Sequence, residues 1–202
     1  MNDLLLYERK CYQLGFPLVV GVDEAGRGPL AGPLVVAGVL FHYGFFIEGV
    51  TDSKKISAKK RQKLEIIIKN EALAYAVEII PLEVIKQKNI YQASKWGMIQ
   101  CFTKIQKKIE VQALLTDAMR ISEKELPKVY VESIIKGDQK SFHIAAASIL
   151  AKMERDRIME TLHEEYPIYN WCKNKGYPTL EHKNAIKNYG ISPYHRTNFK
   201  LF

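Results

Sequence analysis

Four acidic residues of this chain have the types and positions needed to work on a charged substrate: Asp23, the adjacent Glu24, Asp117 and Asp138. Asp23 and Glu24 follow the apolar run 18–22, and Asp117 follows the run 113–116. An unpaired carboxylate in apolar surroundings is costly, so acids at the ends of buried strands need a metal ion, a positive charge or solvent. Since α/β sheets gather their sites at the carboxyl ends of strands, this spacing predicts an acidic active-site edge.

Each of the later acids also suits a structural role. Asp138 precedes a small-residue helix, so local sequence favours helix capping and catalysis about equally. Asp117 could simply bond a neighbouring loop. Asp156 has charged neighbours in the middle of a helix, and we expect it to be ion-paired rather than catalytic.

The segment after Glu24 contains the glycines Gly26 and Gly28 on either side of Arg27. Glycines allow a backbone to come close to a ligand, and the arginine offers a fork of donors suited to phosphate. Neighbouring residues of a regular strand point to opposite faces, so Asp23 and Glu24 cannot converge within one. We therefore predict that the strand ends at Asp23 and that a bend at Gly26 turns Glu24 back toward the site.

Basic residues exceed acidic ones by 30 to 22, a net charge of +8, which favours polyanionic partners without establishing them. Beyond residue 170 the excess is concentrated. The basic residues there are Lys173, Lys175, Lys183, Lys187, Arg196 and Lys200, against Glu181, and the nearby aromatic residues are Tyr169, Trp171, Tyr177, Tyr189 and Tyr194. This mixture suits a surface on which rings pack against sugars or bases, or else a solvated amphipathic segment.

A chain of 202 residues with 47% hydrophobic and 26% charged residues predicts one compact domain, 1–202. Its apolar stretches are too short for a signal peptide or a membrane span, so a cytoplasmic protein is expected. Cys11, Cys101 and Cys172 have no paired spacing, which predicts reduced packing residues rather than disulfides or a zinc site.

The apolar patterns predict an α/β fold with a mixed sheet. Strands are expected at 18–23, 34–41, 73–80, 113–117 and 128–131. Helices are expected from an N-cap at Ser57 to about 71, over 82–108, from Ser141 to about 166, and over 179–189 with Gly190 closing the last one. In the 82–108 helix the residues expected to share one apolar side are Trp96, Met98, Ile99, Phe102 and Ile105.

Taken together, these residues resemble ribonuclease HII, the bacterial type 2 ribonuclease H, over nearly the whole chain. The motifs that carry the resemblance are residues 23–30 (Asp-Glu-Ala-Gly-Arg-Gly-Pro-Leu), 52–55 (Asp-Ser-Lys-Lys), Asp117, Gly137-Asp138 with 145–152, Arg155-Asp156, 174–179, and His195-Arg196 with Phe199. Each motif alone is weak, but their order and spacing make coincidence very unlikely.

The resemblance implies a ribonuclease H-like fold: a mixed five-stranded sheet flanked by helices, with a C-terminal region from about 167 to 202 that helps to hold the duplex. It implies an endoribonuclease that cuts on the 5′ side of a ribonucleotide, in RNA–DNA hybrids and at single ribonucleotides embedded in duplex DNA, leaving a 3′-hydroxyl and a 5′-phosphate. It also implies two Mg²⁺ or Mn²⁺ ions held by the four acids, so that Asp138 is assigned to the site.

The same resemblance implies the substrate contacts. The Gly26-Arg27-Gly28 segment would contact the 2′-hydroxyl, the group that distinguishes RNA from DNA, and Tyr177 would pack on the neighbouring sugar. Lys54 and Lys55 are expected to meet backbone phosphates, although lysines after a turn are commonly only solvated. For His143, His182 and His195, structural roles are expected, because no pair of them has metal-ligand spacing.

Some features narrow the comparison. Ala118 follows Asp117 where the family often has glycine, so the backbone geometry of the loop after Asp117 is less closely implied by the resemblance. Only about 15 residues precede the first strand, whereas ribonuclease HIII carries an N-terminal substrate-binding domain, and this favours type HII. A monomer with no obligate protein partner and no clamp-binding tail is expected.

Two other classes of protein remain as alternatives. A non-catalytic nucleic-acid-binding module would have no use for the acids, which repel phosphates. A metal-dependent phosphatase for small substrates would leave the basic, aromatic C-terminal region without a purpose.

Overall fold

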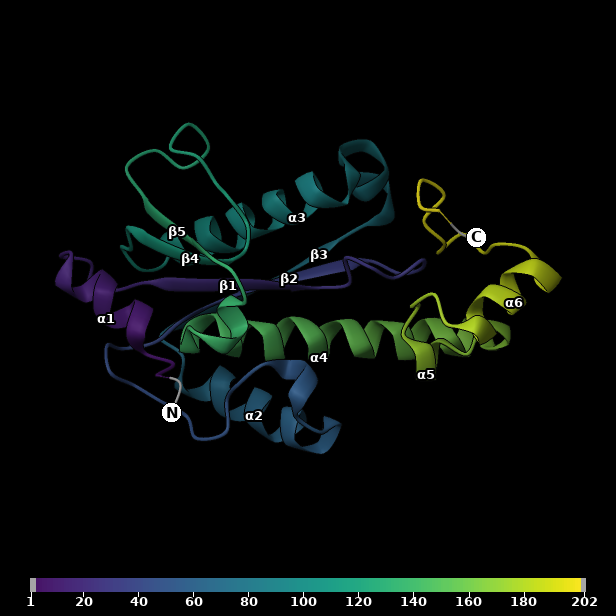
Figure 1. The fold of residues 1–202 in the computed structure, drawn as a ribbon, viewed down its shortest axis with the longest axis horizontal. Helices are drawn as coiled ribbons and strands as arrows, with labels where there is room; N and C mark the ends of the chain where they lie inside the picture. The colour runs from purple at the N-terminus through teal and green to yellow at the C-terminus, as the bar shows by residue number, and fades with distance from the viewer. Residues whose placement is uncertain (1–2, 201–202) are drawn as a thin grey trace.

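The computed structural model describes residues 3–200, which build a five-stranded sheet in the order β3-β2-β1-β4-β5 (Figure 1). The strands are β1 (Val20–Ala25), β2 (Leu34–Leu40), β3 (Ala74–Ile80), β4 (Ala113–Asp117) and β5 (Tyr130–Ile134). The first three pair antiparallel, whereas β4 runs parallel to β1, and β5 parallel to β4. This is the mixed sheet that the sequence predicts.

Helices cover both faces of the sheet (Figure 1). One face packs on α3 (Leu82–Gln106) and the other on α4 (Phe142–Glu165) and α2 (Ala58–Glu71). The remaining α-helices are α1 (Leu6–Gln13), α5 (Trp171–Asn174) and α6 (Leu180–Tyr189), and the short 3₁₀ helices are η1 (Ser53–Lys55), η2 (Gly137–Gln139) and η3 (Pro167–Tyr169). Figure 1 shows α5 and α6 at one end of the molecule, beside the end of α4.

Strand alternation divides the core into two layers. On β2, Val36 contributes to the layer under α3, whereas Val35 and Ala37 contribute to the layer under α4. The contact between α4 and β1 is very close, because a Cβ placed on Gly21 would lie 2.4 Å from the backbone carbon of His143. A glycine at this position lets the first turn of α4 press directly onto the strand that carries the acids.

The helix signals in the sequence are confirmed by their caps. The hydroxyl of Ser57 accepts from Lys60 N–H, and that of Ser141 accepts from Ile144 N–H. Thr179 caps α6 in the same way, and Gly190 follows its last residue. Side-chain acceptors at the N-cap satisfy backbone N–H groups that have no partner within the helix, so these boundaries are fixed locally.

Several predicted boundaries were wrong. The strand expected at 128–131 lies at 130–134, because its register is set by pairing with β4. The helix expected over 82–108 is interrupted at Asn89, whose φ of 62° is not helical and whose side chain accepts from Gln92 N–H. Trp96 is 37% exposed and does not belong to the buried side of that helix. Helices α1 and α5 were not predicted.

The three cysteines are free, as expected, but Cys172 is exposed and is therefore not a packing residue. Cys11 and Cys101 are buried. Within residues 3–200, every helix is too short or too polar to cross a membrane.

Candidate active site

Asp23 and Glu24 both lie inside β1, which continues to Ala25. The prediction that the strand ends at Asp23 and bends back at Gly26 is therefore wrong. The antiparallel partner explains the extra length, because β2 continues the ladder through Asp23–Ala37 and Glu24–Val36. On the other side, β4 pairs with β1 only as far as Val22.

Because the pairing between β1 and β4 stops at Val22, three acids lie close together at this edge of the sheet: Asp23, Glu24 and Asp117. Gly21 faces α4, so by alternation Asp23 faces α4 as well and Glu24 faces α3. Asp117 is the last residue of β4, and the ladder between β1 and β4 ends one residue before it. With no β4 residue paired beside it, Glu24 is close enough to Asp117 for the two charges to affect each other.

Asp138 lies in η2 and is brought to the same edge of the sheet by Asp117. The Asp117 carboxylate accepts a hydrogen bond of 2.7 Å from Gly137 N–H, the residue before Asp138. Asp117 thus bonds a loop, as the structural alternative proposed, and that loop carries another acid of the set. Ser141, not Asp138, caps α4, so the interpretation of Asp138 as a helix cap is wrong.

The electrostatics show a cluster of negative charge that Arg27 and Lys54 compensate only in part. Burial raises the pKa of Asp23 well above its usual range, and the charges of Glu24, Asp117 and Asp138 raise it further. Burial, with Asp52 and Asp117, raises the pKa of Asp138 to about 6. The pKa of Glu24 is raised by burial and by Asp117, although Arg27, 3.3 Å from its Oε1, opposes the shift. Shifts of this kind mark candidate functional sites.

The chemistry of these donors fits a hard divalent cation. All four side chains offer carboxylate oxygens, which Mg²⁺ and Mn²⁺ prefer. The buried Oε2 of Glu24 makes no full hydrogen bond, and the neighbouring Ser94 hydroxyl only acts to lower the pKa of Glu24, so Oε2 is free to serve as a ligand atom. Among residues 3–200, however, no three His, Cys, Asp or Glu side chains are already arranged to hold one ion together.

A cavity of about 510 Å³ has Glu24, but none of the other three acids, in its lining. Its lining residues are Glu24, Ala25, Gly26, Arg27, Gly28, Ser53, Lys54, Ser148, Lys152 and Tyr177. The Gly26-Arg27-Gly28 segment and Tyr177, which are about 150 residues apart in sequence, therefore border the same space. Tyr177 is 40% exposed, and its ring centroid lies 5.9 Å from Cζ of Arg155.

The two predicted lysines differ in position. Lys54 lines the cavity; burial alone would lower its pKa, but Asp23, Asp138 and Asp52 raise it. Lys55 is exposed and does not line the cavity. The structure thus brings Lys54, but not Lys55, to the candidate site.

Three residues of the cavity lie in the motifs 52–55 and 145–152 but were assigned no role from the sequence: Ser53, Ser148 and Lys152. The hydroxyls of Ser53 and Ser148 lie 2.8 Å apart, which joins η1 to α4. Ser148 and Lys152 are four residues apart on one helix, and such a pair faces the same side. That spacing was a signal that could have identified them.

Two buried arginines donate hydrogen bonds to backbone carbonyls of residues 26–33. Arg155 donates to the carbonyls of Ala31, Pro33 and Lys175. Arg196 donates to those of Arg27, Gly32 and Pro33. Both side chains therefore bind the glycine-containing segment, and Arg155 also connects it to the C-terminal region.

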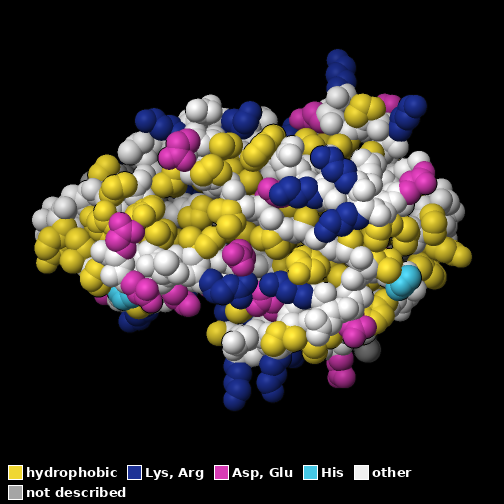
Figure 2. Space-filling model, turned by 180° about the vertical axis from the view of Figure 1, so that it is seen from behind, with side chains coloured by type: hydrophobic (Ala, Val, Ile, Leu, Met, Phe, Trp, Pro, Cys, Tyr) yellow, Lys and Arg dark blue, Asp and Glu magenta, His cyan; other side chains and the backbone are white. Residues whose placement is uncertain are grey.

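The basic, aromatic C-terminal region divides into two parts. Tyr169 and Trp171 are buried and form a small core with Ile186 and Met159, so they are not available to bases. Tyr177 and Tyr189 remain exposed. On the face of the molecule that Figure 2 shows, Lys and Arg side chains lie in separate groups among acidic and hydrophobic ones.

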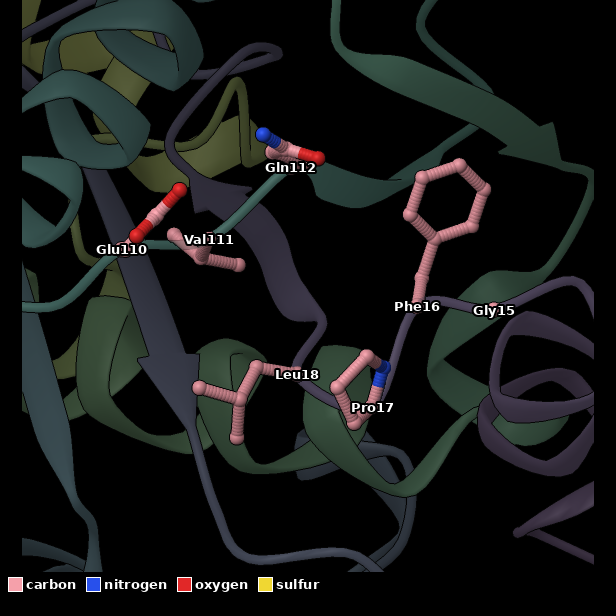
Figure 3. Close-up of a pocket in the computed structure, with 7 residues that line it drawn as sticks. All are labelled: Gly15, Phe16, Pro17, Leu18, Glu110, Val111 and Gln112. Atoms are coloured by element: carbon pink, nitrogen blue, oxygen red, sulfur yellow. The ribbon is translucent and has the colours of Figure 1, made fainter.

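A second cavity, of about 200 Å³, lies at the opposite end of the strands, between residues 15–18 and 110–112. Figure 3 shows Glu110 and Val111 on one side of it and Pro17 and Leu18 on the other. These residues precede the amino ends of β1 and β4, whereas Asp23 and Asp117 lie toward the carboxyl ends. The acids and the cavity of about 510 Å³ that Glu24 lines thus lie toward the same end of the sheet.

This sheet, its helices and the acids at its edge define a protein with the ribonuclease H-like fold. The structure matches the crystal structure of ribonuclease H2 from Pyrococcus horikoshii OT3 with a TM-score of 0.71 and 26% identity, over 91% of this chain and 94% of that one. It matches ribonuclease HIII in complex with Mn²⁺ with a TM-score of 0.72 at 19% identity, over 95% of this chain and 70% of that one, which shows the common fold.

Sequence comparison specifies the family. The family model described as Ribonuclease HII matches residues 20–202. Ribonuclease HII of Caldanaerobacter subterraneus subsp. tengcongensis is 46% identical over 98% of this chain and 80% of its own length, and that of Acholeplasma laidlawii is 47% identical over 98% and 94%. The chain belongs to the ribonuclease HII family, endonucleases that act on RNA–DNA hybrids. This sets aside the binding module and the small-molecule phosphatase.

Proposed function

We propose that this endonuclease hydrolyses the phosphodiester on the 5′ side of a ribonucleotide, both in RNA–DNA hybrids and at single ribonucleotides in duplex DNA, leaving a 3′-hydroxyl and a 5′-phosphate. The observation that carries the proposal is that the Gly26-Arg27-Gly28 segment lines one cavity together with Glu24 and with Lys54, on which the charges of Asp23 and Asp138 act. Hydrolysis needs the acids, and discrimination needs a group that can reach the sugar.

Asp23, Glu24, Asp117 and Asp138 are proposed to hold Mg²⁺ or Mn²⁺, two ions during catalysis. Bound ions would supply Lewis-acid chemistry, by offsetting phosphate charge and making water a better nucleophile. The mutual repulsion that raises the pKa of Asp23 supports this role, because such a cluster gains most from added positive charge. A solved ribonuclease HIII of the same fold is described as a complex with Mn²⁺.

The remaining residues would bind and orient the strand. Lys54 lies beside the acids and carries charge that suits a backbone phosphate. In the free protein, the Arg27 side chain donates to the Glu24 carboxylate, and Arg196 donates to the backbone carbonyl of Arg27. The segment is therefore fixed before substrate binds. Lys55 is assigned a more distant phosphate contact.

Discrimination of RNA from DNA is assigned to the 2′-hydroxyl, which both donates and accepts hydrogen bonds. Backbone groups of Gly26-Arg27-Gly28 would meet it, and Tyr177 would pack on the adjacent sugar. The 3.7 Å between the Cβ position of Gly28 and Tyr177 Cε1 shows that the two elements are neighbours. Residues from about 167 to 202 are proposed as a substrate-binding part of a single domain that acts as a monomer.

The experiment is incision of an end-labelled DNA duplex that contains one ribonucleotide, with Mg²⁺, with Mn²⁺ and with chelator. Wild type is compared with Asp23→Asn and with Glu65→Gln, a buried carboxylate that pairs with Arg157 and Lys69 away from the cavity. We expect metal-dependent incision 5′ to the ribonucleotide, its loss in Asp23→Asn and its retention in Glu65→Gln. Product ends are identified by ligation and phosphatase treatment.

Other results would contradict separate parts of the proposal. Cleavage of an RNA–DNA hybrid without incision at a single ribonucleotide would remove the assignment of Gly26-Arg27-Gly28 and Tyr177 to the junction. Full activity of Asp23→Asn would remove the acid assignment. A relative from Archaeoglobus fulgidus, 27% identical over 92% of this chain and 96% of its own, with a TM-score of 0.72, was solved as a complex with PCNA. A purified sliding clamp added to this assay tests whether this chain forms such a complex.

A further inference from the structure

Two histidines that the proposed chemistry does not use lie in direct contact behind Tyr177. His182 of α6 and His195 are 0% and 3% exposed, and their Nε2 atoms lie 3.1 Å apart. Both rings pack in the small C-terminal core against Trp171 and Tyr169. Two buried imidazoles this close can share only one hydrogen bond, so the position of each proton has consequences.

Fixed donors determine those positions. The backbone N–H of Ser192 can only donate, and it lies 2.9 Å from Nδ1 of His195. The Ser192 hydroxyl, also 2.9 Å from Nδ1, accepts from Tyr194 N–H and can donate to the ring, so Nδ1 carries no proton. The indole N–H of Trp171 can only donate, and it lies 3.0 Å from Nε2 of His182, so that nitrogen is bare as well.

One arrangement of the two neutral rings satisfies both conditions. His195 carries its proton on Nε2 and donates it to Nε2 of His182, whose single lone pair is shared with the Trp171 N–H. His182 then carries its proton on Nδ1, which lies 2.9 Å from the carbonyl oxygen of Tyr177, an atom that can only accept. Each hydrogen bond in this series therefore has one donor and one acceptor, starting at the Ser192 and Trp171 N–H groups and ending at the Tyr177 carbonyl.

Both rings are neutral at neutral pH. Burial lowers the pKa of His182, and burial together with His182 lowers the pKa of His195 to about 4. A second proton on either ring would face a donor, since each bare nitrogen already accepts an N–H.

The last bond of the series restrains the backbone that carries the substrate-facing ring. The N–H of Tyr177 donates to Asn174 O at 2.9 Å, and its carbonyl accepts from Thr179 N–H at 2.8 Å as well as from His182, so both sides of the residue are held while its ring borders the cavity. Building on the role proposed above for Tyr177, we propose that His182 is a positioning residue for Tyr177 and that His195 selects the tautomer of His182 that allows it.

The two side-chain amides at position 182 separate positioning from packing. Asparagine places its amide near Nδ1 and can still donate to the Tyr177 carbonyl. Glutamine reaches the Nε2 position and can accept from Trp171, but it leaves that carbonyl with the backbone N–H of Thr179 and without its side-chain donor. His182→Gln is expected to lower kcat/KM at a single ribonucleotide roughly tenfold, mainly through KM, because small displacements of an orienting group have large effects. His182→Asn should keep most of the wild-type kcat/KM. The control is His42→Gln, because His42 is exposed and takes no part in these hydrogen bonds.

A double-mutant cycle with Tyr177→Ala tests whether His182 acts through Tyr177. We expect His182→Gln to have little further effect once Tyr177 is alanine. Equal fold-losses from His182→Gln in both backgrounds would overturn the inference while leaving the Tyr177 assignment intact. No loss from Tyr177→Ala itself would overturn the Tyr177 assignment, and the inference with it, so the two failures are distinguishable.

A second measurement does not depend on any variant. Long-range ¹H–¹⁵N correlation spectra of the intact protein report the tautomer of each histidine. The expected result is Nδ1–H for His182 and Nε2–H for His195 at pH 7. Observation of Nε2–H on His182 would overturn the inference, because that tautomer has no proton to donate to Tyr177.

Discussion

The side chain of Arg155 occupies the space next to Gly26 in which any other residue would place its Cβ. A Cβ built on Gly26 would lie 2.2 Å from Nε of Arg155, well inside van der Waals contact. Nε also donates to the carbonyl of Pro33, and the other guanidinium nitrogens reach Ala31 and Lys175. Arg155 therefore supports the glycine-containing segment from beneath and cannot move away without releasing three carbonyls.

Gly26→Ala is expected to lower the free energy of unfolding by more than about 2 kcal/mol and to reduce cleavage of every substrate. The φ of Gly26 is +106°, and the new methyl group would displace Arg155. Urea denaturation gives the measurement. Gly15→Ala is the control, because Gly15 also has a positive φ, +89°, but has nothing within 4 Å of the Cβ position. Equal losses in the two variants would show that the contact with Arg155 does not matter.

Gly28→Ala separates substrate approach from folding. The nearest atom to a Cβ at Gly28 is Tyr177 Cε1 at 3.7 Å, an ordinary contact, so stability should stay within about 0.5 kcal/mol. If a sugar approaches this backbone closely, kcat/KM at a single ribonucleotide should fall at least about tenfold. Unchanged kinetics in a fully folded variant would place the sugar elsewhere.

Ala118→Gly should stabilise the protein by about 0.5–1 kcal/mol, because Ala118 has a φ of +50°, where a Cβ is unfavourable. Its N–H bond to the Ile134 carbonyl, 3.0 Å long, does not involve the side chain and should persist. This conformation explains why a glycine suits the position after Asp117. Ala58→Gly, at an exposed helical residue, should have the opposite sign. A loss of thermal stability in Ala118→Gly would contradict the conformation.

Asp23→Asn should raise stability in chelator by about 1–2 kcal/mol, or roughly 3–6 °C in Tm, while abolishing cleavage. The charge of Asp23 is buried and repelled by three other acids, and the amide removes that charge at similar volume. Glu65→Gln should lose stability instead. Burial alone would raise the pKa of Glu65, but Arg157 and Lys69 hold it below its usual range, so that carboxylate is favourable. A lower Tm for Asp23→Asn would mean that the cluster is compensated in the free protein.

Asp138 should make the metal-free protein less stable as pH rises from about 4 to above 6. Its pKa in the folded chain is about 6 against an ordinary 3.8, so its proton binds the folded state more tightly. The stabilisation is complete below pH 3.8 and is lost as pH rises through 6, by at most about 3 kcal/mol. His195, with a pKa of about 4, acts in the opposite direction, but it does so equally in Asp138→Asn.

The measurement is therefore the difference between wild-type and Asp138→Asn unfolding free energies across this pH range in chelator. The difference should grow with pH between 4 and 6 and then become constant. Parallel plots of unfolding free energy against pH for the two proteins would show that folding does not raise the pKa of Asp138.

Local sequence was sufficient for the features that local physics controls. Ser57 caps the helix that it was predicted to cap, and Ser141 and Thr179, predicted as the starts of their helices, are the N-caps there, because an N-cap bond joins residues three apart. The apolar runs before Asp23 and Asp117 likewise predicted strands, since alternation and burial are written along the chain. The motif order identified the family and the ribonuclease H-like sheet.

Tertiary structure decided what depends on residues distant in sequence. The length of β1 follows from its pairing with β2, so Glu24 faces α3 rather than bending back after Asp23. Asp138 is not a helix cap, and it reaches the other acids because Gly137 N–H binds Asp117, 20 residues earlier. The support of Gly26 by Arg155 and the histidine chain behind Tyr177 join segments that share no local pattern. Hydrogen-bond partners and electrostatic neighbours are set by position in space, and a sequence alone orders residues only along the chain.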